Sequence, residues 1–160
     1  AFKNADFWVS MKQWDLALNP NRREKASFLK ENFLPIQESG HLKLMEKDTE
    51  LFANVKIKLF NGHTDGQIIP FINFKNKTLV YMGDLIPCIA HLPLPYITSY
   101  DVRPLLALNE KEDFLNEALE NGYTLFFEHD LYNECCTLQN TAKGIREKEK
   151  FNLKDFICRS

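Results

Sequence analysis

The sequence has no long apolar run, no internal repeat and no extended stripe of basic residues. No stretch approaches the roughly 20 apolar residues that a membrane-spanning helix needs, so we expect no membrane partner. The 20 Lys and Arg residues are interspersed with 22 Asp and Glu residues, and the net charge is -2. This balance gives no reason to expect nucleic acid as a partner. The N-terminus also lacks the basic and then apolar stretch of a signal peptide.

Cysteine is scarce, and its pattern is not that of a disulfide-rich secreted domain. The four cysteines are Cys88, Cys135, Cys136 and Cys158, and their spacing does not form a compact disulfide framework. Cys135 and Cys136 are adjacent, so in a strand they point to opposite faces. We expect free thiols in a reducing compartment, and therefore a cytoplasmic protein. The sequence starts without Met, which we interpret as the sign of a processed, cleaved or partly observed product.

The length suits one domain with its own core, which we assign to residues 1–160. Apolar periodicity predicts strands over residues 7–9, 41–45, 55–60, 67–74, 78–82, 123–127 and 135–139. It predicts helices over residues 11–18, 23–33 and 109–120, the last with a capping box of Asn109 and Glu112. The charged tail, residues 144–154, has Phe151, Leu153 and Phe156 as apolar anchors in and just after it. The segment Pro87–Pro104 is apolar and proline-rich, which predicts a structured loop of the kind that often covers a site.

Strands with intervening helices predict an α/β (α+β) arrangement, a mixed sheet with helices on one face. Three polar residues, His63, Asp84 and His129, each follow the end of a predicted strand. If the strand directions agree, their side chains converge at one edge of the sheet. Two imidazoles and a carboxylate suit zinc, and also iron or manganese, with positions left for water. A single His after a strand is more commonly a surface residue, and an Asp after Gly is more commonly a turn residue, so spacing alone leaves both interpretations open.

The turn around His63 has features of a built site. Gly62 and Gly66 bracket the histidine and permit a tight backbone path that a residue with a Cβ would resist. Thr64 and Asp65 are then candidates to orient the imidazole ring or to close the turn.

Three segments carry a resemblance to metallo-β-lactamase-fold proteins, over about residues 5–129. Gly62-His63-Thr64-Asp65-Gly66-Gln67 is similar to the Gly-His-Thr-x-Gly motif of that family. Met82-Gly83-Asp84 is similar to its later Gly-Asp motif, and Phe127-Glu128-His129-Asp130 to its strand-end histidine. The order matches too, with a hairpin between the first two motifs and a helix before the third. His91-Leu92-Pro93-Leu94-Pro95 resembles the loop after Gly-Asp in one hydrolase branch.

The resemblance implies a partial αββα sandwich, of which this chain is the C-terminal portion. It implies that His63 binds the first of two zinc ions, that His129 binds the second, and that Asp84 bridges them as the catalytic carboxylate. In the family, a metal-bound hydroxide attacks a carbonyl, phosphoryl or thioester centre. Bound metal lowers the pKa of water from 15.7 to about 7. His91 is a candidate to contact the substrate, and the alternative is a structural role in its loop.

The sequence also departs from the family. The main metal-binding signature, His-x-His-x-Asp-His, is absent, because His41, His63, His91 and His129 are far apart in sequence. The three candidate ligands offer at most one or two donors per ion, so we expect weak or no metal binding and no efficient catalysis by this chain alone. A half-sandwich exposes one sheet face, for which we expect a homodimer or strand exchange.

The leading hypothesis is therefore a metal-dependent, zinc-using hydrolase of a small molecule, with only part of the metal site in this chain. The alternative is a non-catalytic remnant that serves assembly or partner binding. A third hypothesis is a redox member of the same fold that uses iron, as a dioxygenase-like enzyme would. The apolar stretch from His91 to Tyr96 suggests a partly apolar substrate.

Overall fold

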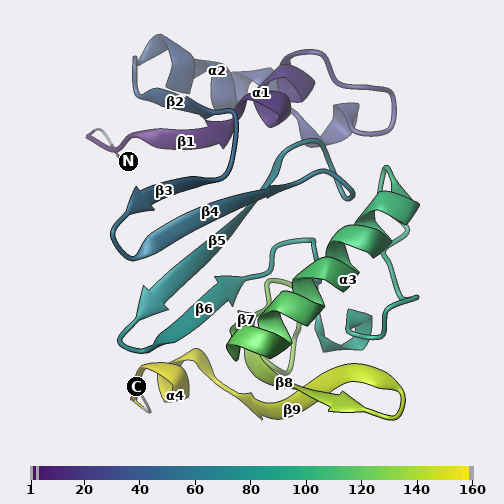
Figure 1. The fold of residues 1–160 in the computed structure, drawn as a ribbon. Coiled ribbons are helices and arrows are strands. Elements are labelled where there is room, and N and C mark those ends of the chain that lie inside the picture. The colour runs from purple at the N-terminus through teal and green to yellow at the C-terminus, as the bar shows by residue number, and fades with distance from the viewer. Residues whose placement is uncertain (1, 3, 159–160) are drawn as a thin grey trace.

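The computed structural model describes residue 2 and residues 4–158 of the chain. The strands are β1 (Phe7–Ser10), β2 (Leu42–Met45), β3 (Thr49–Phe52), β4 (Val55–Phe60), β5 (Gln67–Phe74), β6 (Lys77–Tyr81), β7 (Thr124–Phe126), β8 (Cys135–Thr141) and β9 (Gly144–Phe151). The helices are α1 (Met11–Leu18), η1 (Lys25–Ser27), α2 (Lys30–Glu38), η2 (Ile89–His91), α3 (Pro104–Asn121) and α4 (Leu153–Cys158). The strands form a mixed sheet in the order β3-β4-β5-β6-β7-β8-β9 and a parallel pair, β1-β2 (Figure 1). The α/β architecture predicted from the sequence is confirmed.

The directions of the strands bring three strand ends to one edge of the large sheet. β4, β5 and β6 run antiparallel in turn, and β6 and β7 form a parallel pair. β4, β6 and β7 therefore run the same way, so their carboxyl ends meet at the same edge. The parallel step is made by a crossover that contains the proline-rich loop and α3. The residues that follow β4, β6 and β7 are consequently neighbours in space.

α3 covers one face of the large sheet (Figure 1). Its residues Phe114, Leu115 and Ala118 recur at helical spacing and are buried. They share one core cluster with strand residues that include Val80 and Leu125. This apolar contact fixes the helix on the sheet and, with it, the loop that leads into the helix.

The opposite face of the sheet carries a smaller cluster, in which Leu79 and Cys135 pack with Phe156 of α4. Cys136, the next residue of β8, belongs to the cluster under α3, so the adjacent cysteines point to opposite faces as predicted. All four cysteines are free. Burial raises the pKa of the Cys135 and Cys136 thiols to about 12. Neither thiol is a nucleophile at neutral pH, because the thiolate is the reactive form.

The single helix predicted over residues 23–33 is wrong. The structure instead has the short η1 and then α2, which contains Pro35. The side-chain oxygen of Asn21 accepts the N–H groups of Arg23 and Glu24 at 2.9 and 3.0 Å. Local side-chain bonds of this kind favour a turn over a helix. The residues at the start of the predicted helix therefore form a turn, and α2 begins at Lys30.

α3 begins at Pro104 rather than at Asn109. Proline suits the first position of a helix, because its φ is already helical and its missing N–H would have no partner there. Asn109 therefore lies inside the helix and does not cap it. The helix ends at Asn121, one residue beyond the predicted end, with Gly122 in a left-handed conformation as its C-cap.

Two edge strands, β3 and β9, are absent from the sequence-based prediction. β9 lies in the segment predicted as a charged tail, and it pairs along β8. An edge strand tolerates charged side chains because one of its sides faces water, so its sequence does not show the usual alternation. The predicted anchors Phe151, Leu153 and Phe156 do pack together, in the cluster on the face opposite α3. Within the described residues, no helix is long and apolar enough to cross a membrane.

The turn after β4 lies directly against the first turns of α3. A Cβ added to Gly62 would lie 2.3 Å from the Cα of Ala107, so no side chain fits there. The Glu110 carboxylate accepts the backbone N–H groups of Asn61 and Gly62, each at 2.8 Å. The N–H of Arg103 reaches the carbonyl of Gly62 at 2.9 Å. α3 thereby holds the turn immediately before His63.

We predict that Gly62→Ala destabilises the fold by about 2 kcal/mol, the usual cost of overpacking a buried contact. Urea denaturation of the purified chain measures this loss. Gly122→Ala is the control, because nothing lies within 4 Å of the added Cβ and only the cost of its left-handed backbone remains. Equal losses in the two variants would contradict the close contact as the cause.

Candidate metal centre

His63, Asp84 and His129 meet at the edge where β4, β6 and β7 end. The Asp84 carboxylate lies between the two rings, with Oδ2 3.3 Å from His63 Nε2 and Oδ1 3.2 Å from His129 Nε2. The convergence expected from the strand ends is therefore present. The His63 side chain is 19% exposed and that of His129 is 56% exposed, so the site opens to solvent on the His129 side.

His63 and Asp84 shift each other's pKa in opposite directions. The hydrogen bond to Asp84 raises the pKa of His63, against the opposing effect of burial. The same bond to His63 lowers the pKa of Asp84, again against burial. Each partner thus favours the charged form of the other.

Neighbouring polar groups fix the turn that carries His63. The hydroxyl of Ser10 donates to the carbonyl of Gly66 at 2.6 Å and accepts the N–H of Gln13 as the cap of α1. Gly66 has φ +69, a left-handed conformation that glycine adopts without strain. The sequence analysis expected a glycine here for a tight backbone path, and the left-handed backbone of Gly66 agrees with that expectation.

Thr64 and Asp65, the predicted candidates to orient the ring, have other partners. The Thr64 hydroxyl donates to the Glu24 carboxylate at 2.6 Å. Asp65 forms an ion pair with Arg103 at 2.9 Å. Both residues close the turn, which is the second role that the sequence allowed for them.

The contact to the second ring nitrogen comes from Asp101, which the sequence analysis did not single out. Asp101 Oδ1 lies 2.8 Å from His63 Nδ1, and the Asp101 side chain is only 4% exposed. Asp101 belongs to the proline-rich segment, which was expected to cover a site. Thr98, three positions earlier in the sequence, donates its backbone N–H and its hydroxyl to the Asp101 carboxylate. This Thr-x-x-Asp spacing is the local sequence signal for a carboxylate that is held in place.

His129 is held through its backbone. Its N–H donates to the carbonyl of Pro87 at 3.1 Å, which ties the end of β7 to the loop after β6. The next residue, Asp130, accepts backbone N–H groups from Ile89, Tyr132 and Asn133. Burial alone raises the pKa of Asp130, but these hydrogen bonds outweigh it and lower the pKa. The ring of His129 is exposed, and its backbone is fixed.

A cavity of about 420 Å³ borders the group. His63 and Asp84 line one side of it. The remaining lining residues come from α1, from the segment around η1, from the turn after β4, from the start of β5 and from the proline-rich loop: Gln13, Arg23, Glu24, Ser27, Phe28, Thr64, Gln67 and Tyr100. The cavity offers a cation and two aromatic rings beside the candidate ligands.

His91 does not line this cavity with His63 and Asp84. It lies on η2, where its Nδ1 is 3.1 Å from Cys88 Sγ. Burial, and then the charge of Lys111, lower the pKa of its ring. The role of His91 in substrate binding stays a prediction.

Lys111 of α3 is buried and organises the loop that contains His91. Its Nζ donates to the carbonyl oxygens of His91, Pro93 and Tyr96 at 3.1, 3.1 and 2.8 Å. An ammonium has three donors, and all three find an acceptor in one loop. Burial lowers the pKa of Lys111 to about 8, so the ammonium form still predominates at pH 7.

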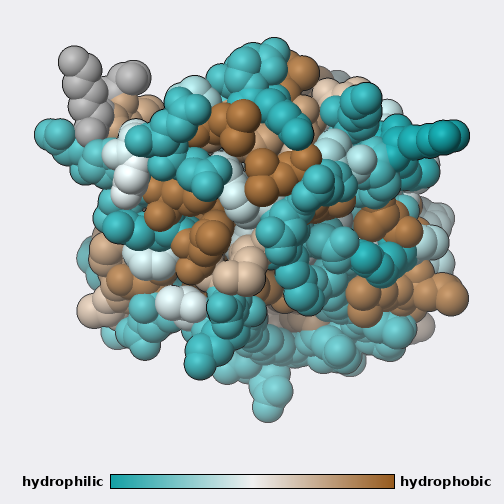
Figure 2. All heavy atoms as spheres, turned by 90° about the horizontal axis from the view of Figure 1, so that it is seen from above, coloured by the Kyte–Doolittle hydropathy of each residue, from teal (hydrophilic) through white to brown (hydrophobic). Residues whose placement is uncertain are grey.

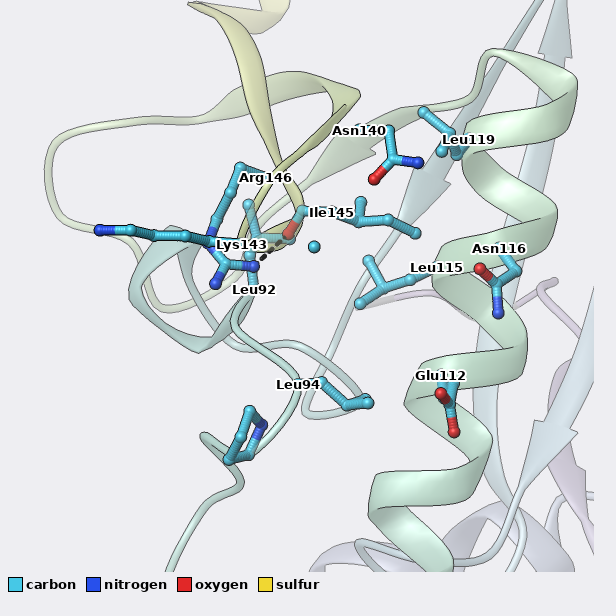
Figure 3. Close-up of a pocket in the computed structure, with 12 residues that line it drawn as sticks. Leu92, Leu94, Glu112, Leu115, Asn116, Leu119, Asn140, Lys143, Ile145 and Arg146 are labelled. Atoms are coloured by element: carbon cyan, nitrogen blue, oxygen red, sulfur yellow. Dashed lines mark hydrogen bonds between the residues drawn. The ribbon is translucent and has the colours of Figure 1, made fainter.

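The loop borders a second cavity on its other side, of about 290 Å³, which α3 and the β8–β9 hairpin complete (Figure 3). Leu94 of the loop points across it toward α3, and Leu115 points from α3 toward the hairpin (Figure 3). None of the three candidate ligands is among its lining residues. This cavity is separate from the candidate metal centre.

The donor set fits one flank of a two-ion site. His63 and Asp84 can face one ion, and His129 and Asp84 can face the other, while Asp101 supports the far nitrogen of His63. Each ion would receive two donors, whereas a catalytic zinc normally has three protein ligands. Within the described part of the chain, no cluster of three or more His, Cys, Asp or Glu side chains is arranged to hold an ion by itself. The residues fit a metal site in type and placement, and they do not complete it.

Solved structures show which fold this is. A probable metal-dependent hydrolase from Staphylococcus aureus matches with a TM-score of 0.81 and 27% identity, over 94% of this chain and 55% of that chain. AidC, a dizinc quorum-quenching lactonase, matches with a TM-score of 0.73 and 22% identity, over 94% of this chain and 57% of that one. AbOPH, a hydrolase of the β-lactamase superfamily, matches with a TM-score of 0.76 and 19% identity, over 93% and 56%. No protein-family model and no curated protein matches the sequence.

The chain therefore has the metallo-β-lactamase fold in part. It spans about half the length of the solved structures it matches, 55 to 57% for these three. The structural likeness to these three hydrolases confirms the fold that the three sequence motifs imply.

We predict that Lys111→Met loosens the loop of residues 91–96. The change leaves three carbonyl oxygens without their charged donor and lowers the free energy of unfolding by about 3 kcal/mol. Hydrogen–deuterium exchange should show faster exchange in this loop, with the exchange of the central strands altered less. Lys148→Met, on the exposed side of β9, is the matched control and should leave the loop unchanged. Unchanged loop exchange in Lys111→Met would refute the tether.

We predict a pH-dependent contribution of the His63–Asp84 pair to the stability of the metal-free chain. The pKa of His63 is raised above its ordinary 6.5, so this contribution is complete below pH 6.5 and is lost as the pH rises through the folded pKa. The pKa of Asp84 is lowered below its ordinary 3.8, so its part is lost as the pH falls through the folded pKa. Urea denaturation in EDTA should show a larger stability difference between wild type and His63→Gln at pH 6 than at pH 9. A difference independent of pH would count against the pair.

Proposed function

We propose that this chain is part of a metal-dependent hydrolase, with His63 and Asp84 as ligands of one zinc ion and Asp84 and His129 as ligands of a second. The observation that carries the proposal is the convergence of these three side chains at one sheet edge. The likeness in fold to metal-dependent hydrolases supports it. Asp84 would bridge the ions because each of its oxygens faces a different ring.

A bound metal would lower the pKa of water to about 7 and so make a hydroxide nucleophile available at neutral pH. The residues of this chain would hold and orient the site. Asp84 would hold the His63 side and the His129 side of the site at a fixed distance from each other. The contact between Gly62 and α3 would fix the backbone that carries His63. Zinc is our proposal for the metal. Iron or manganese accepts the same ligands, and metal analysis of the loaded protein separates them.

We propose a small, partly apolar substrate with an acyl bond, such as an ester or lactone. The cavity beside His63 and Asp84 has the rings of Phe28 and Tyr100 for an apolar part and the guanidinium of Arg23 for a polar part. An N-acyl homoserine lactone hydrolase of similar fold has been solved with its product, N-hexanoyl-L-homoserine, bound at the catalytic metal centre, which supports this class of substrate. His91 remains proposed as a further contact, from the loop that flanks Tyr100. The free cysteines favour the cytoplasm as the compartment.

We predict that the chain alone binds zinc weakly, because it supplies two donors per ion, and that it gains affinity and hydrolytic activity when an N-terminal half of the same fold is supplied in trans. Isothermal titration with ZnCl₂ and an ester and lactone panel measure the two effects. Asp84→Asn should lower zinc affinity by about tenfold or more, which corresponds to about 1.4 kcal/mol.

Asp65→Asn is the matched control for Asp84→Asn. Asp65 lies on the same edge and pairs with Arg103 instead of the candidate ligands, so its zinc affinity should stay at the wild-type value. Zinc binding that is equally insensitive to both substitutions, or no gain on complementation, would refute the hydrolase proposal.

A second candidate function is partner binding or assembly, including a homodimer. Apolar side chains reach the surface among hydrophilic ones on the side of β1, β2, α1 and α2 (Figure 2). The exposed apolar residues of these elements and of the turn between the helices include Trp8, Leu29 and Leu44. Large exposed apolar residues favour an interface. Sedimentation analysis of the chain, with and without the N-terminal half, distinguishes a self-association face from one that the other half covers.

A further inference from the structure

We infer that Asp101 is the positioning residue for His63, and that it fixes the ring with a proton on Nδ1 and with Nε2 directed at Asp84. The inference rests on the proposed function only in taking Nε2 as the nitrogen that would face a metal. The two side chains come from distant segments, the turn after β4 and the proline-rich loop. Their contact is 2.8 Å long, and the carboxylate is almost completely buried.

The surroundings of the carboxylate determine the direction of this hydrogen bond. The Thr98 hydroxyl donates to Asp101 Oδ1 at 2.7 Å, and the Thr98 backbone N–H donates to Oδ2 at 3.0 Å. An ionised carboxylate only accepts hydrogen bonds. In this contact His63 Nδ1 must therefore donate. Asp84 is the competing acceptor at Nε2, but it lies farther from the ring, at 3.3 Å, and is more exposed. When the ring is neutral we therefore expect its one proton on Nδ1, which leaves the lone pair on Nε2.

Backbone hydrogen bonds also join the segment that carries Asp101 to the turn that carries His63. The N–H of Val102 donates to the carbonyl of His63 at 3.1 Å, and the N–H of Arg103 donates to that of Gly62 at 2.9 Å. The residues next to Asp101 thus run beside the turn that carries His63. The ring is held at its backbone and at Nδ1, and only Nε2 faces Asp84. A metal ligand fixed in this way loses little rotamer freedom on binding.

No other acid within the described residues has a recorded contact with Nδ1. Asp65 is engaged by Arg103, and Glu24 accepts the hydroxyl of Thr64. The sequence had offered Thr64 and Asp65 for this role because they are next to His63. The structure assigns it instead to a residue 38 positions along the chain.

The test is the tautomer of His63 in the metal-free, ¹⁵N-labelled full chain. Two-bond ¹H–¹⁵N spectra of the histidine rings, recorded in EDTA at a pH where the ring is neutral, show which nitrogen carries the proton. We expect Nδ1–H in the wild type, although free histidine prefers Nε2–H. In Asp101→Ala the two nitrogens should exchange their protonated and unprotonated shifts. Asp101→Asn keeps an oxygen acceptor and should retain mainly Nδ1–H.

Asp65→Asn is the control and should leave the tautomer unchanged. An Nε2–H ring in the wild type, or a tautomer that Asp101→Ala does not change, would overturn the inference. If Asp101→Ala fails to fold, as judged by its amide spectrum, the wild type and Asp101→Asn still decide. Because no metal is present, the result is independent of hydrolysis. The hydrolase proposal fails on zinc binding and turnover, and this inference fails on the ring spectrum.

Discussion

The contact of the β4–β5 turn with α3 is the constraint on which the rest of the structure depends. Gly62 lies so close to the backbone of Ala107 that any side chain would separate the helix from the sheet edge. Glu110 makes the approach possible by accepting the N–H groups that the turn would otherwise leave unpaired. With the helix held there, its first turn, the end of the loop and the carboxylate of Asp101 all reach the same edge as His63.

The local sequence pattern places His63, Asp84 and His129 at the ends of apolar strands, and the resemblance of three motifs to one family singles them out as candidate ligands. Strand ends are local features: a period-2 pattern stops and a polar residue follows. Their convergence also needs strand direction, which the short turn between β5 and β6 supplies for one pair and the long crossover supplies for β6 and β7. The meeting of His63, Asp84 and His129 at one sheet edge was therefore an expectation that depended on strand direction, and the structure shows that the three side chains do meet there.

The supporting residues were not predictable, because their partners are far away in sequence and lie in irregular backbone. Lys111 has the sequence setting of a surface lysine between two acids on a helix, and nothing local shows that three loop carbonyls surround it. Asp101 lies in a loop with no periodic pattern. The wrong helix over residues 23–33 has a local cause, the side-chain bonds of Asn21, which compete with helical spacing. β9 was missed because its charges mask the alternation that identifies inner strands.

The ammonium group of Lys111 lies among three carbonyl oxygens of one loop, an arrangement that also suits an inorganic cation. Carbonyl oxygens gathered around one compact positive charge are how potassium-selective sites replace an ion's hydration shell. Here the charge is covalently attached to α3, so it cannot be chelated, exchanged or diluted away. The three carbonyl oxygens of the loop therefore need no ion from the medium as their partner. Only deprotonation removes this charge, and a pKa of about 8 means that half of the Lys111 side chains have lost it at about that pH.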